Sequence, residues 1–346
     1  MVTQRIGVLT GGGDCPGLNA VIRGIVRRGV EQHNLSVVGF RDGWQGVLEG
    51  ATVPLTVEST RGILHRGGTM LGTSRTDPIA VDGGVGRIHD ALEVHRLDGL
   101  VVIGGEGTLS AATQLHAEHA VPIVGVPKTI DNDLGGTQYT IGFATALDIA
   151  TEAVDRLHST AESHNRVMVL EVMGRHAGWI ATYAGIAGGA DAILIPEQPF
   201  DINRVCRHLK RRHGTGRTFS IVVVAEGAVP APGTIELPDY DVDAFGRPVL
   251  GGIANHLGPL IEQRTGFSTR VTILGHVQRG GSPNAADRVL GSTMGVTACD
   301  FAVQQRWGQM TALQGLAVVP VPLGEATARL KQVPPEIYEV AEVFFG

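Results

Sequence analysis

The sequence predicts an α/β fold with two similar three-layer α/β domains, largely parallel sheets, and an active site in the cleft between them. Short apolar, β-branched runs alternate along the chain with segments of helical periodicity, as in parallel sheets covered by helices. The length of 346 residues suffices for about two domains. The 49 glycines gather directly after the apolar runs, at the edge where such sheets bind ligands.

The expected strands are short runs, each followed by glycine or a polar residue. They cover Ile6 to Leu9, Val37 to Phe40, Leu100 to Ile103, Pro122 to Val126, Val167 to Val172, Ile193 to Ile195, Ile221 to Ala225 and Val271 to Leu274. Between the first two strands, apolar residues recur at helical spacing from Leu18 to Val26, and Pro16 suits a first turn. The sequence therefore indicates repeated strand–helix units.

Two strand–helix series suggest the domain boundaries. We expect residues 1–144 with about 282–330 to form one domain, and 145–281 to form the other. The segment from Pro230 to Pro248, rich in proline and aspartate, reads as a loop insertion. Residues 331–346 read as an appended C-terminal tail.

Composition excludes several classes of protein. Lys and Arg total 28 against 34 Asp and Glu, a net charge of −6, so nothing attracts the chain to nucleic acid or an anionic membrane. The basic run from Arg207 to His213 is expected to be a solvated helix end. No apolar run approaches the ~18 residues of a membrane span, no export leader is evident, and three separated cysteines suit a reducing compartment. We therefore expect a cytoplasmic protein.

Two glycine-rich turns indicate phosphate binding. GGGDCPGLN at 11–19 joins a strand to a helix, so backbone amides and a helix dipole could hold a phosphate. It lacks both the dinucleotide fingerprint and the lysine of a P-loop, and its glycines could instead serve close helix–strand packing. In GGEGT at 104–108, Glu106 could hold Mg²⁺ or simply cap the turn.

The densest polar cluster is PKTIDND at 127–133. Asp131 and Asp133 could divide labour, one taking a proton from an attacking hydroxyl and the other organising metal and backbone. Arginines that follow strands or glycine turns suit bidentate phosphate binding. These cations are Arg75, Arg166, Arg175, Arg270 and Arg279, together with His276.

The chain resembles the bacterial type of 6-phosphofructokinase. The resemblance rests on GVLTGGGDCPGLNAVIRG, GGTMLGTSR, IGGEGTL, PKTIDND, SHNR, EVMGRHAGW, VVAEG and LGHVQRGGSP, in that order, over roughly residues 5 to 290. It implies a glycolytic enzyme that transfers the γ-phosphoryl group of ATP to the 1-hydroxyl of fructose 6-phosphate, with Mg²⁺. Such a transfer depends mainly on positioning and charge stabilisation.

The resemblance also implies that the domain of residues 1–144 with about 282–330 binds the nucleotide and magnesium, and that the domain of residues 145–281 binds the sugar phosphate. It further implies a role for each motif residue. Asp131 would be the general base, Thr129 would lie beside it, and Arg175 would stabilise the transferring group. The nucleotide site would be lined by Gly12, Gly13, Arg75, Thr76, Gly105, Gly107 and Thr108, with Glu106 on Mg²⁺. The sugar phosphate would be bound by Thr129, Ile130, Asp131, Arg166, Met173, Gly174, Arg175, Glu226, Arg270, His276, Val277, Gln278 and Arg279. Arg166 and Arg270 would reach the site of a neighbouring subunit, which implies a homodimer or homotetramer.

Two positions depart from the ATP-dependent pattern. Glu106 replaces an aspartate, so metal contact could become water-mediated, and Lys128 stands where the ATP enzymes usually have glycine. Gly107, in contrast, favours ATP, because the pyrophosphate enzymes typically carry an aspartate there. Gly107 and Lys128 thus become the donor-selecting residues, and ATP is favoured over pyrophosphate.

Other classes fit less of the sequence. A lipid or NAD kinase explains neither PKTIDND nor the motif of His276 and Arg279. A non-catalytic nucleotide-binding homologue should have lost Asp131, Thr129 or Arg175. Regulation does not carry over, because Arg23 and Arg27 match an effector site whose other basic positions hold His158 and the segment 214–217.

Overall fold

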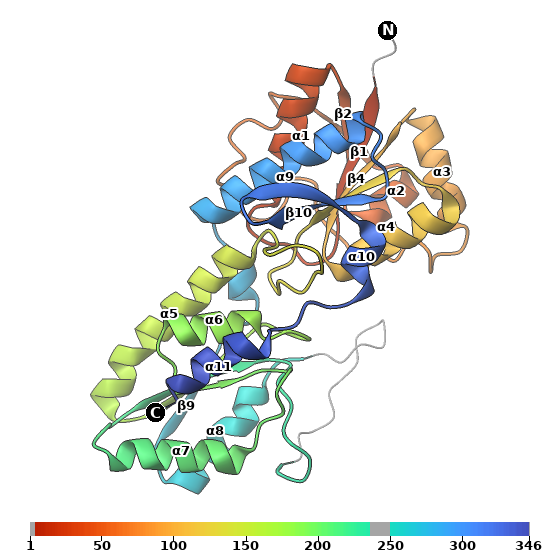
Figure 1. The fold of residues 1–346 in the computed structure, drawn as a ribbon. Helices are drawn as coiled ribbons and strands as arrows, with labels where there is room; N and C mark the ends of the chain where they lie inside the picture. Colours follow the sequence, from red (N-terminus) through yellow and green to blue (C-terminus); the bar gives the residue numbers. More distant parts are fainter. Residues whose placement is uncertain (1–3, 236–249, 346) are drawn as a thin grey trace. The chain divides into compact units, whose positions relative to one another are not determined.

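The computed structural model describes residues 4–235 and 250–345 (Figure 1). The chain divides into two compact units. Unit 1 is Met1–Thr145 with Arg279–Leu330, and unit 2 is Ala146–Gln278 with Lys331–Gly346. Most of the expected loop insertion, from 236 onward, lies outside the described residues, while residues 232–234 form a turn. Each unit is described by itself.

Unit 1 contains a seven-stranded sheet of order β11-β10-β5-β4-β1-β2-β3. Its five inner strands are parallel to one another, whereas the two outermost pairs, β2 with β3 and β10 with β11, are antiparallel. The strands are β1 (Arg5–Thr10), β2 (Ser36–Phe40), β3 (Thr52–Leu55), β4 (Gly99–Gly104), β5 (Ile123–Pro127), β10 (Gln309–Gln314) and β11 (Ala317–Pro322). Because β1, β4 and β5 are parallel neighbours, the segments that follow them meet at one edge.

Helices cover both faces of this sheet because its central strands are apolar on both sides. Leu9, Leu100 and Val102 share one core with four helices, whereas Val8 and Val101, which alternate with them, are buried toward the other face. On that other face α1 (Leu18–His33) and α9 (Ala285–Val303) lie side by side (Figure 1). The four helices of the first core are α2 (Trp44–Glu49), α3 (Gly84–Val94), α4 (Glu106–His119) and α10 (Leu323–Ala328).

Unit 2 contains a four-stranded, fully parallel sheet of order β7-β8-β6-β9. The strands are β6 (Val167–Val172), β7 (Ala192–Leu194), β8 (Ser220–Ala225) and β9 (Thr269–Ile273). The helices are α5 (Phe143–His164), whose first turn carries the boundary between units, α6 (Trp179–Ala187), α7 (Ile202–Gly214), α8 (Ile253–Thr265) and α11 (Pro335–Val343), with a 3₁₀ turn at Gly275–Arg279. Helices α7 and α8 share one apolar core with this sheet.

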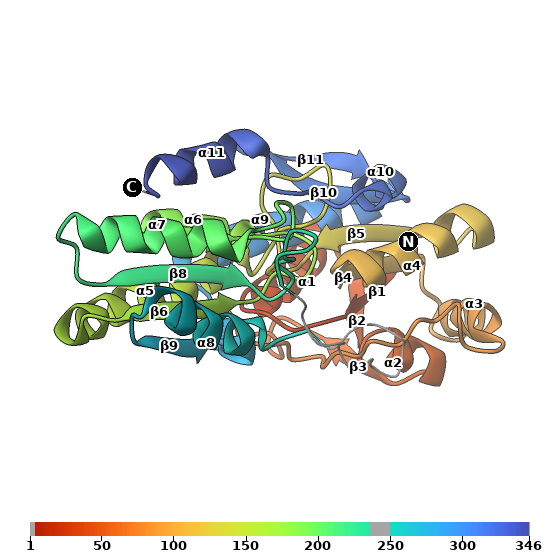
Figure 2. The same ribbon diagram turned by 90° about the horizontal axis from the view of Figure 1, so that it is seen from below.

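The C-terminal segment packs on unit 2, where α11 lies against α6 (Figure 2). The Trp179 indole donates to the Lys331 carbonyl at 2.8 Å, and the Val333 amide donates to Glu197 at 2.9 Å. The buried Tyr338 hydroxyl donates to the Ile193 carbonyl of β7 at 2.6 Å. Three hydrogen bonds thus tie this segment to unit 2, one of them to the edge strand β7.

The predicted α/β class with largely parallel sheets is confirmed, and each expected strand is present within a residue or two. Strands β3, β10 and β11 were not predicted. Pro54 interrupts β3 and Pro320 interrupts β11, and these two strands form the edges of the sheet, where proline is tolerated.

Candidate phosphate and sugar site

The loop after β1 is the first part of the site. Gly12 adopts a φ of 77°, which glycine accepts without strain. The Gly11 amide donates to the Ile103 carbonyl and the Gly12 amide to the Ser74 carbonyl, both at 2.9 Å. The loop is therefore attached to β4 on one side and to the segment containing Arg75 and Thr76 on the other.

The loop after β4 packs directly beneath the first loop. Gly105 precedes α4 in an extended conformation, with no side-chain cap on the helix. The side chain of Thr108 is buried against Gly11, where an added Cβ would lie 2.7 Å from its Cγ2. Gly107 is exposed, and an added Cβ would meet open space. The amino end of α4 thus offers uncapped amides to an anion.

The segment after β5 brings carboxylates to the same edge. The Asp131 amide donates to Thr129 Oγ1 at 3.1 Å, and Thr140 Oγ1 donates to the Thr129 carbonyl at 2.6 Å. Asp131 is half-buried and Thr129 is partly accessible, whereas the Ile130 side chain is fully buried. Ile130 can therefore reach a substrate only through its backbone.

Asp133 has an unusual electrostatic environment. Burial, followed by the charges of Asp131 and Glu106, raises the pKa of Asp133 from 3.8 to about 7. Its Oδ1 atom is buried and has no hydrogen-bond partner within residues 4–235 and 250–345. Three carboxylates therefore influence one another at this edge, and one of them is under-satisfied.

These carboxylates fit a magnesium ion. Mg²⁺ is commonly held by one or two carboxylates together with substrate phosphates, not by a complete protein cage. Glu106 is exposed at the start of α4 and accepts a hydrogen bond from Ser110 Oγ at 3.1 Å, and Asp133 keeps a buried oxygen without a donor. Within the described part of the chain no group of three or more His, Cys, Asp or Glu side chains forms a metal cage.

Lys128 lies below the first glycine loop. Its side chain is 2% exposed, and its ammonium donates to the Gly11 carbonyl at 2.9 Å and to the Gly13 carbonyl. Burial lowers the pKa of Lys128. Arg279 approaches the same loop: its Nη1 donates to the Asp14 carbonyl at 3.3 Å, and an added Cβ on Gly13 would come within 2.6 Å of it.

In unit 2 most of the predicted sugar-phosphate residues gather at the carboxyl edge of the sheet. Strands β6, β8 and β9 are parallel neighbours, so the residues that follow them meet at that edge. The residues of this carboxyl-edge set are Met173, Gly174, Arg175, Glu226, His276, Val277 and Gln278. The Glu226 amide donates to the Val172 carbonyl at 2.9 Å, which ties the ends of β6 and β8 together.

Two of these residues support the backbone. Gly174 has a φ of 143°, and its carbonyl accepts from the Gly227 amide at 3.1 Å. Gln278 is fully buried and accepts from the Met173 amide at 3.4 Å. Val277, in contrast, is 66% exposed, so it is open to a ligand.

Arg166 and Arg270 lie at the opposite edge of the same sheet. Arg166 immediately precedes β6, and Arg270 is the second residue of β9, paired with Met168. The Arg270 guanidinium lies 3.7 Å from Glu262. At ~3.3 Å per residue, strands of this length separate the two edges by roughly 15 Å. The unit therefore does not bring these arginines together with the carboxyl-edge set.

Sequence reasoning missed two residues that hold the first loop in place. Thr73 Oγ1 donates to the Gly12 carbonyl at 2.6 Å, and the Ser74 carbonyl accepts from the Gly12 amide. Both belong to GGTMLGTSR, from which only Arg75 was selected, together with Thr76 directly after the motif. The hydroxyls in that motif were the available signal.

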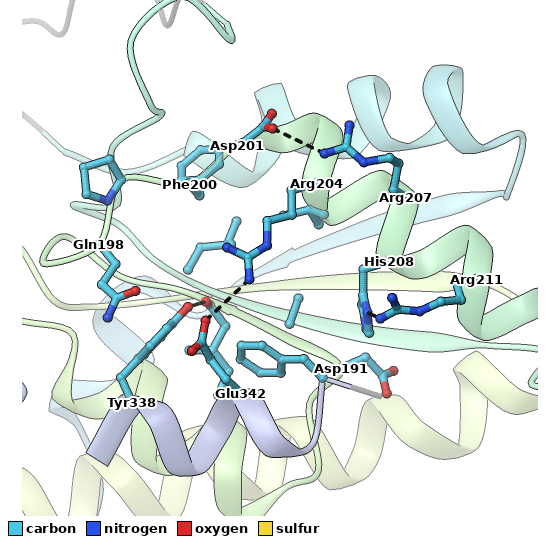
Figure 3. A pocket seen from close by; sticks show the side chains of 16 residues that line it. Asp191, Gln198, Phe200, Asp201, Arg204, Arg207, His208, Arg211, Tyr338 and Glu342 are labelled. Carbon is cyan, nitrogen blue, oxygen red and sulfur yellow. Dashed lines mark hydrogen bonds and ion pairs between the residues drawn. The ribbon is translucent and has the colours of Figure 1, made fainter. Parts of the chain in front are cut away.

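Unit 2 also holds a pocket of about 640 Å³ between α7, α11 and the edge strand β7 (Figure 3). Its arginines face carboxylates: Arg204 lies 3.9 Å from Glu342, and Arg207 lies 3.8 Å from Asp201. The lining contains three arginines and three carboxylates, with Asp191 buried against Arg212 at 2.9 Å. Because the charges cancel, this pocket is not a phosphate site of the kind formed in unit 1.

Comparison with known proteins decides the family. The phosphofructokinase family model matches residues 5–302. The chain belongs to the phosphofructokinase family. It is accordingly a phosphotransferase, and the predicted resemblance is confirmed.

Similar proteins differ in the donor that their names give. The pyrophosphate–fructose 6-phosphate 1-phosphotransferase of Streptomyces coelicolor is 56% identical over 343 residues, covering 99% of this chain and all of that protein. The ATP-dependent 6-phosphofructokinase of Mycobacterium tuberculosis is 54% identical over 344 residues, covering 99% of this chain and all of that protein. Family membership therefore leaves the donor open.

Solved structures agree on the fold. Phosphofructokinase from Saccharomyces cerevisiae is 33% identical with a TM-score of 0.80, covering 99% of this chain. This phosphofructokinase chain spans about half the length of that yeast protein, 47%. The pyrophosphate-dependent enzyme from Nitrosospira multiformis, at 20% identity and a TM-score of 0.84, shares the fold and covers 96% of this chain and 86% of its own. Among the described residues, no helix combines the length and apolarity of a membrane span.

Proposed function

We propose that this phosphofructokinase transfers the γ-phosphoryl group of ATP to the 1-hydroxyl of fructose 6-phosphate, giving fructose 1,6-bisphosphate and ADP. The observation that carries ATP as donor is Gly107. It lies in the first turn of α4, exposed and facing open space, where a side chain would stand in the way of a nucleotide. The uncapped start of α4 and the glycine loop before α1 supply amides for its phosphates.

In this reaction Asp131 accepts the proton of the 1-hydroxyl, whose oxygen then bonds to the γ-phosphorus. The bond between that phosphorus and the oxygen bridging it to the β-phosphate breaks, and ADP leaves. Asp131 is half-buried, and its own amide is fixed on Thr129 Oγ1, so its carboxylate is held in place. Arg175, which follows β6, would stabilise charge on the transferring group, as its place in EVMGR implies.

Glu106 would hold magnesium together with the donor phosphates. When bound, the ion neutralises charge on the phosphate oxygens. The buried oxygen of Asp133 would orient a water or a metal ligand from behind. Met173, Glu226, His276 and Arg279 would bind the sugar phosphate.

The active enzyme is proposed to be a homo-oligomer. Arg166 and Arg270 lie at the amino edge of the unit 2 sheet, away from the residues that would bind the sugar phosphate in the same chain. They would therefore complete the site of a neighbouring copy, as the family resemblance implies.

Pyrophosphate is the second candidate donor. It is favoured by the relatives of Streptomyces and Amycolatopsis, 54–56% identical, whose names state that donor. A decisive test supplies purified protein with Mg²⁺ and fructose 6-phosphate, adds ATP or pyrophosphate in separate reactions, and measures fructose 1,6-bisphosphate. ATP should give product. Product with pyrophosphate alone would overturn the assignment of Gly107, and product with neither would overturn the function.

A further inference from the structure

Four consecutive carbonyls of the first glycine loop are held by side chains. Lys128 Nζ donates to Gly11 at 2.9 Å and to Gly13, Thr73 Oγ1 donates to Gly12 at 2.6 Å, and Arg279 Nη1 donates to Asp14 at 3.3 Å. Buried carbonyls need donors, and these three side chains supply them from the protein side. The acceptor groups of the loop are therefore turned away from any ligand.

The amides of this loop divide into two groups. Those of Gly11 and Gly12 donate to backbone carbonyls of the protein. Those of Gly13, Asp14 and Cys15 have no acceptor anywhere in residues 4–235 and 250–345. Successive unpaired amides before a helix form an anion-binding concavity. Fixing the carbonyls inward is what leaves these amides open to the donor phosphates.

Lys128 is the principal support of this arrangement. It follows β5 and is 2% exposed, and two of its three N–H groups donate to loop carbonyls. A charged donor forms stronger hydrogen bonds than a neutral one, so its two bonds hold more tightly than that of Thr73. A lysine that bound the donor directly would instead present its ammonium to solvent.

We propose that Lys128 is a positioning residue, which holds the Gly11–Gly13 loop so that the amides of Gly13 and Asp14 face the donor phosphates. This inference rests on the proposed function in so far as the loop binds the phosphoryl donor. It assigns Lys128 no contact with the donor, and it leaves donor selection to Gly107.

Two variants test the support directly. Lys128→Met keeps the side-chain length but removes the charged donors, and Thr73→Val removes the bond to Gly12. Lys210→Met, at an exposed position on α7, is the matched control for loss of a lysine. Hydrogen exchange of the Gly11 and Gly12 amides is measured in the ligand-free protein, and the KM of each substrate is measured with ATP and with pyrophosphate.

The proposal expects both loop variants to exchange these amides faster, Lys128→Met by about 10-fold or more and Thr73→Val by less. Donor KM should rise by about 10- to 100-fold in Lys128→Met, with the KM for fructose 6-phosphate nearly unchanged. The ratio of kcat/KM between the two donors should stay that of the wild type. Lys210→Met should match the wild type throughout.

Unchanged exchange in Lys128→Met would show that Lys128 does not hold the loop, and a shifted donor ratio would show that it contacts the donor. Either result would overturn the proposal. Because exchange is followed in the free protein, it still decides the role of Lys128 if the wild type turns over neither donor. If Lys128→Met does not fold, NMR of labelled lysines in the wild type replaces it, since Lys210 and Lys331 are the other lysines of the chain. A buried ammonium signal that persists, barely shifted, with ATP supports positioning, and a large shift contradicts it.

Discussion

The two sheets differ in how many of their predicted site residues lie at the carboxyl edge. In unit 1, the segments after β1, β4 and β5 bring glycine amides, carboxylates and Lys128 to one edge, and all of them belong to that unit. In unit 2, Arg175, Glu226 and His276 follow the strands, whereas Arg166 and Arg270 lie at the other edge. The groups named for the first edge thus follow the strands of one sheet, whereas two of the cations predicted for the second lie at the opposite edge of its sheet. Under the function proposed above, phosphoryl chemistry would depend on one chain, while sugar-phosphate binding would depend on two.

Asp131→Ala tests the chemical half of this comparison. Because Asp131 is proposed to be the general base of unit 1, kcat should fall by about 10²- to 10⁴-fold while folding is retained. Steady-state kinetics together with thermal unfolding check both points. Turnover close to that of the wild type would remove Asp131 from its role. Asp148→Asn, on α5 away from the motif, serves as a control for loss of an aspartate.

Arg270→Ala tests the binding half. Removing a cation that is proposed to bind the sugar phosphate should raise the KM for fructose 6-phosphate by about 10- to 100-fold, with a smaller change in kcat. Mixed oligomers then ask which copy Arg270 serves. Co-expressed Asp131→Ala and Arg270→Ala chains should regain about a quarter of wild-type activity, because random assembly pairs an intact base with an intact arginine at one site in four.

The same mixture contradicts the two-chain interpretation if no activity returns beyond the sum of the separate variants. In that case Arg270 would act in its own chain, and the separation of the two sheet edges would need another explanation. Arg264→Ala, at a partly exposed position near the end of α8, provides the matched control for loss of an arginine.

Gly107→Asp tests whether the unit 1 edge discriminates between ATP and pyrophosphate at Gly107. The carboxylate would enter the open space beside the first turn of α4 and repel a nucleotide phosphate. We expect kcat/KM with ATP to fall by about 10- to 100-fold, with any pyrophosphate activity much less affected. Parallel assays with both donors check this prediction. Equal losses with both would show that Gly107 does not discriminate between them.

The α/β fold and the parts of the site that follow parallel strands could be predicted from the sequence. Glycines after Leu9 and Ile103 and the carboxylates after Pro127 fall where the alternating pattern ends, so their shared edge is predictable. Strand–helix order also predicts where Met173 and Glu226 lie. The amino-acid sequence does not reveal in which direction a side chain points.

Lys128 and Arg279 show this limit. Their residue types indicate phosphate binding, yet Lys128 turns beneath Gly11 and Gly13, and Arg279 donates to Asp14. A lysine reaches either direction from the same position in the sequence, and only packing decides between them. The strands β10 and β11 could not be predicted for a similar reason. Strand β10 joins the sheet by pairing with β5 across more than 180 residues, and β11 then pairs with β10.

Asp133→Asn contrasts a buried carboxylate of unit 1 with Glu171 in unit 2. Glu171 accepts from the amides of Gly252 and Ala254 at 2.7 and 2.9 Å, whereas Asp133 Oδ1 has no partner among the described residues. Burial raises the pKa of Asp133 to about 7, while an unfolded aspartate ionises near 3.9. Between these values the folded state binds more protons, so its stability should fall as pH rises and should level off above pH 7.

Asparagine cannot ionise, so the variant should lose this decline. Its free energy of unfolding should exceed that of the wild type at pH 8 by about 2 kcal/mol and approach it near pH 5. Denaturant unfolding across this range checks the prediction, with Asp90→Asn on the exposed face of α3 as control. If the free energy of unfolding of the wild type and of Asp133→Asn changed with pH in parallel, Asp133 would be ionised in the folded state at little cost in stability. Its lack of a donor to Oδ1 among the described residues would then distinguish it from Glu171 in structure but not in stability.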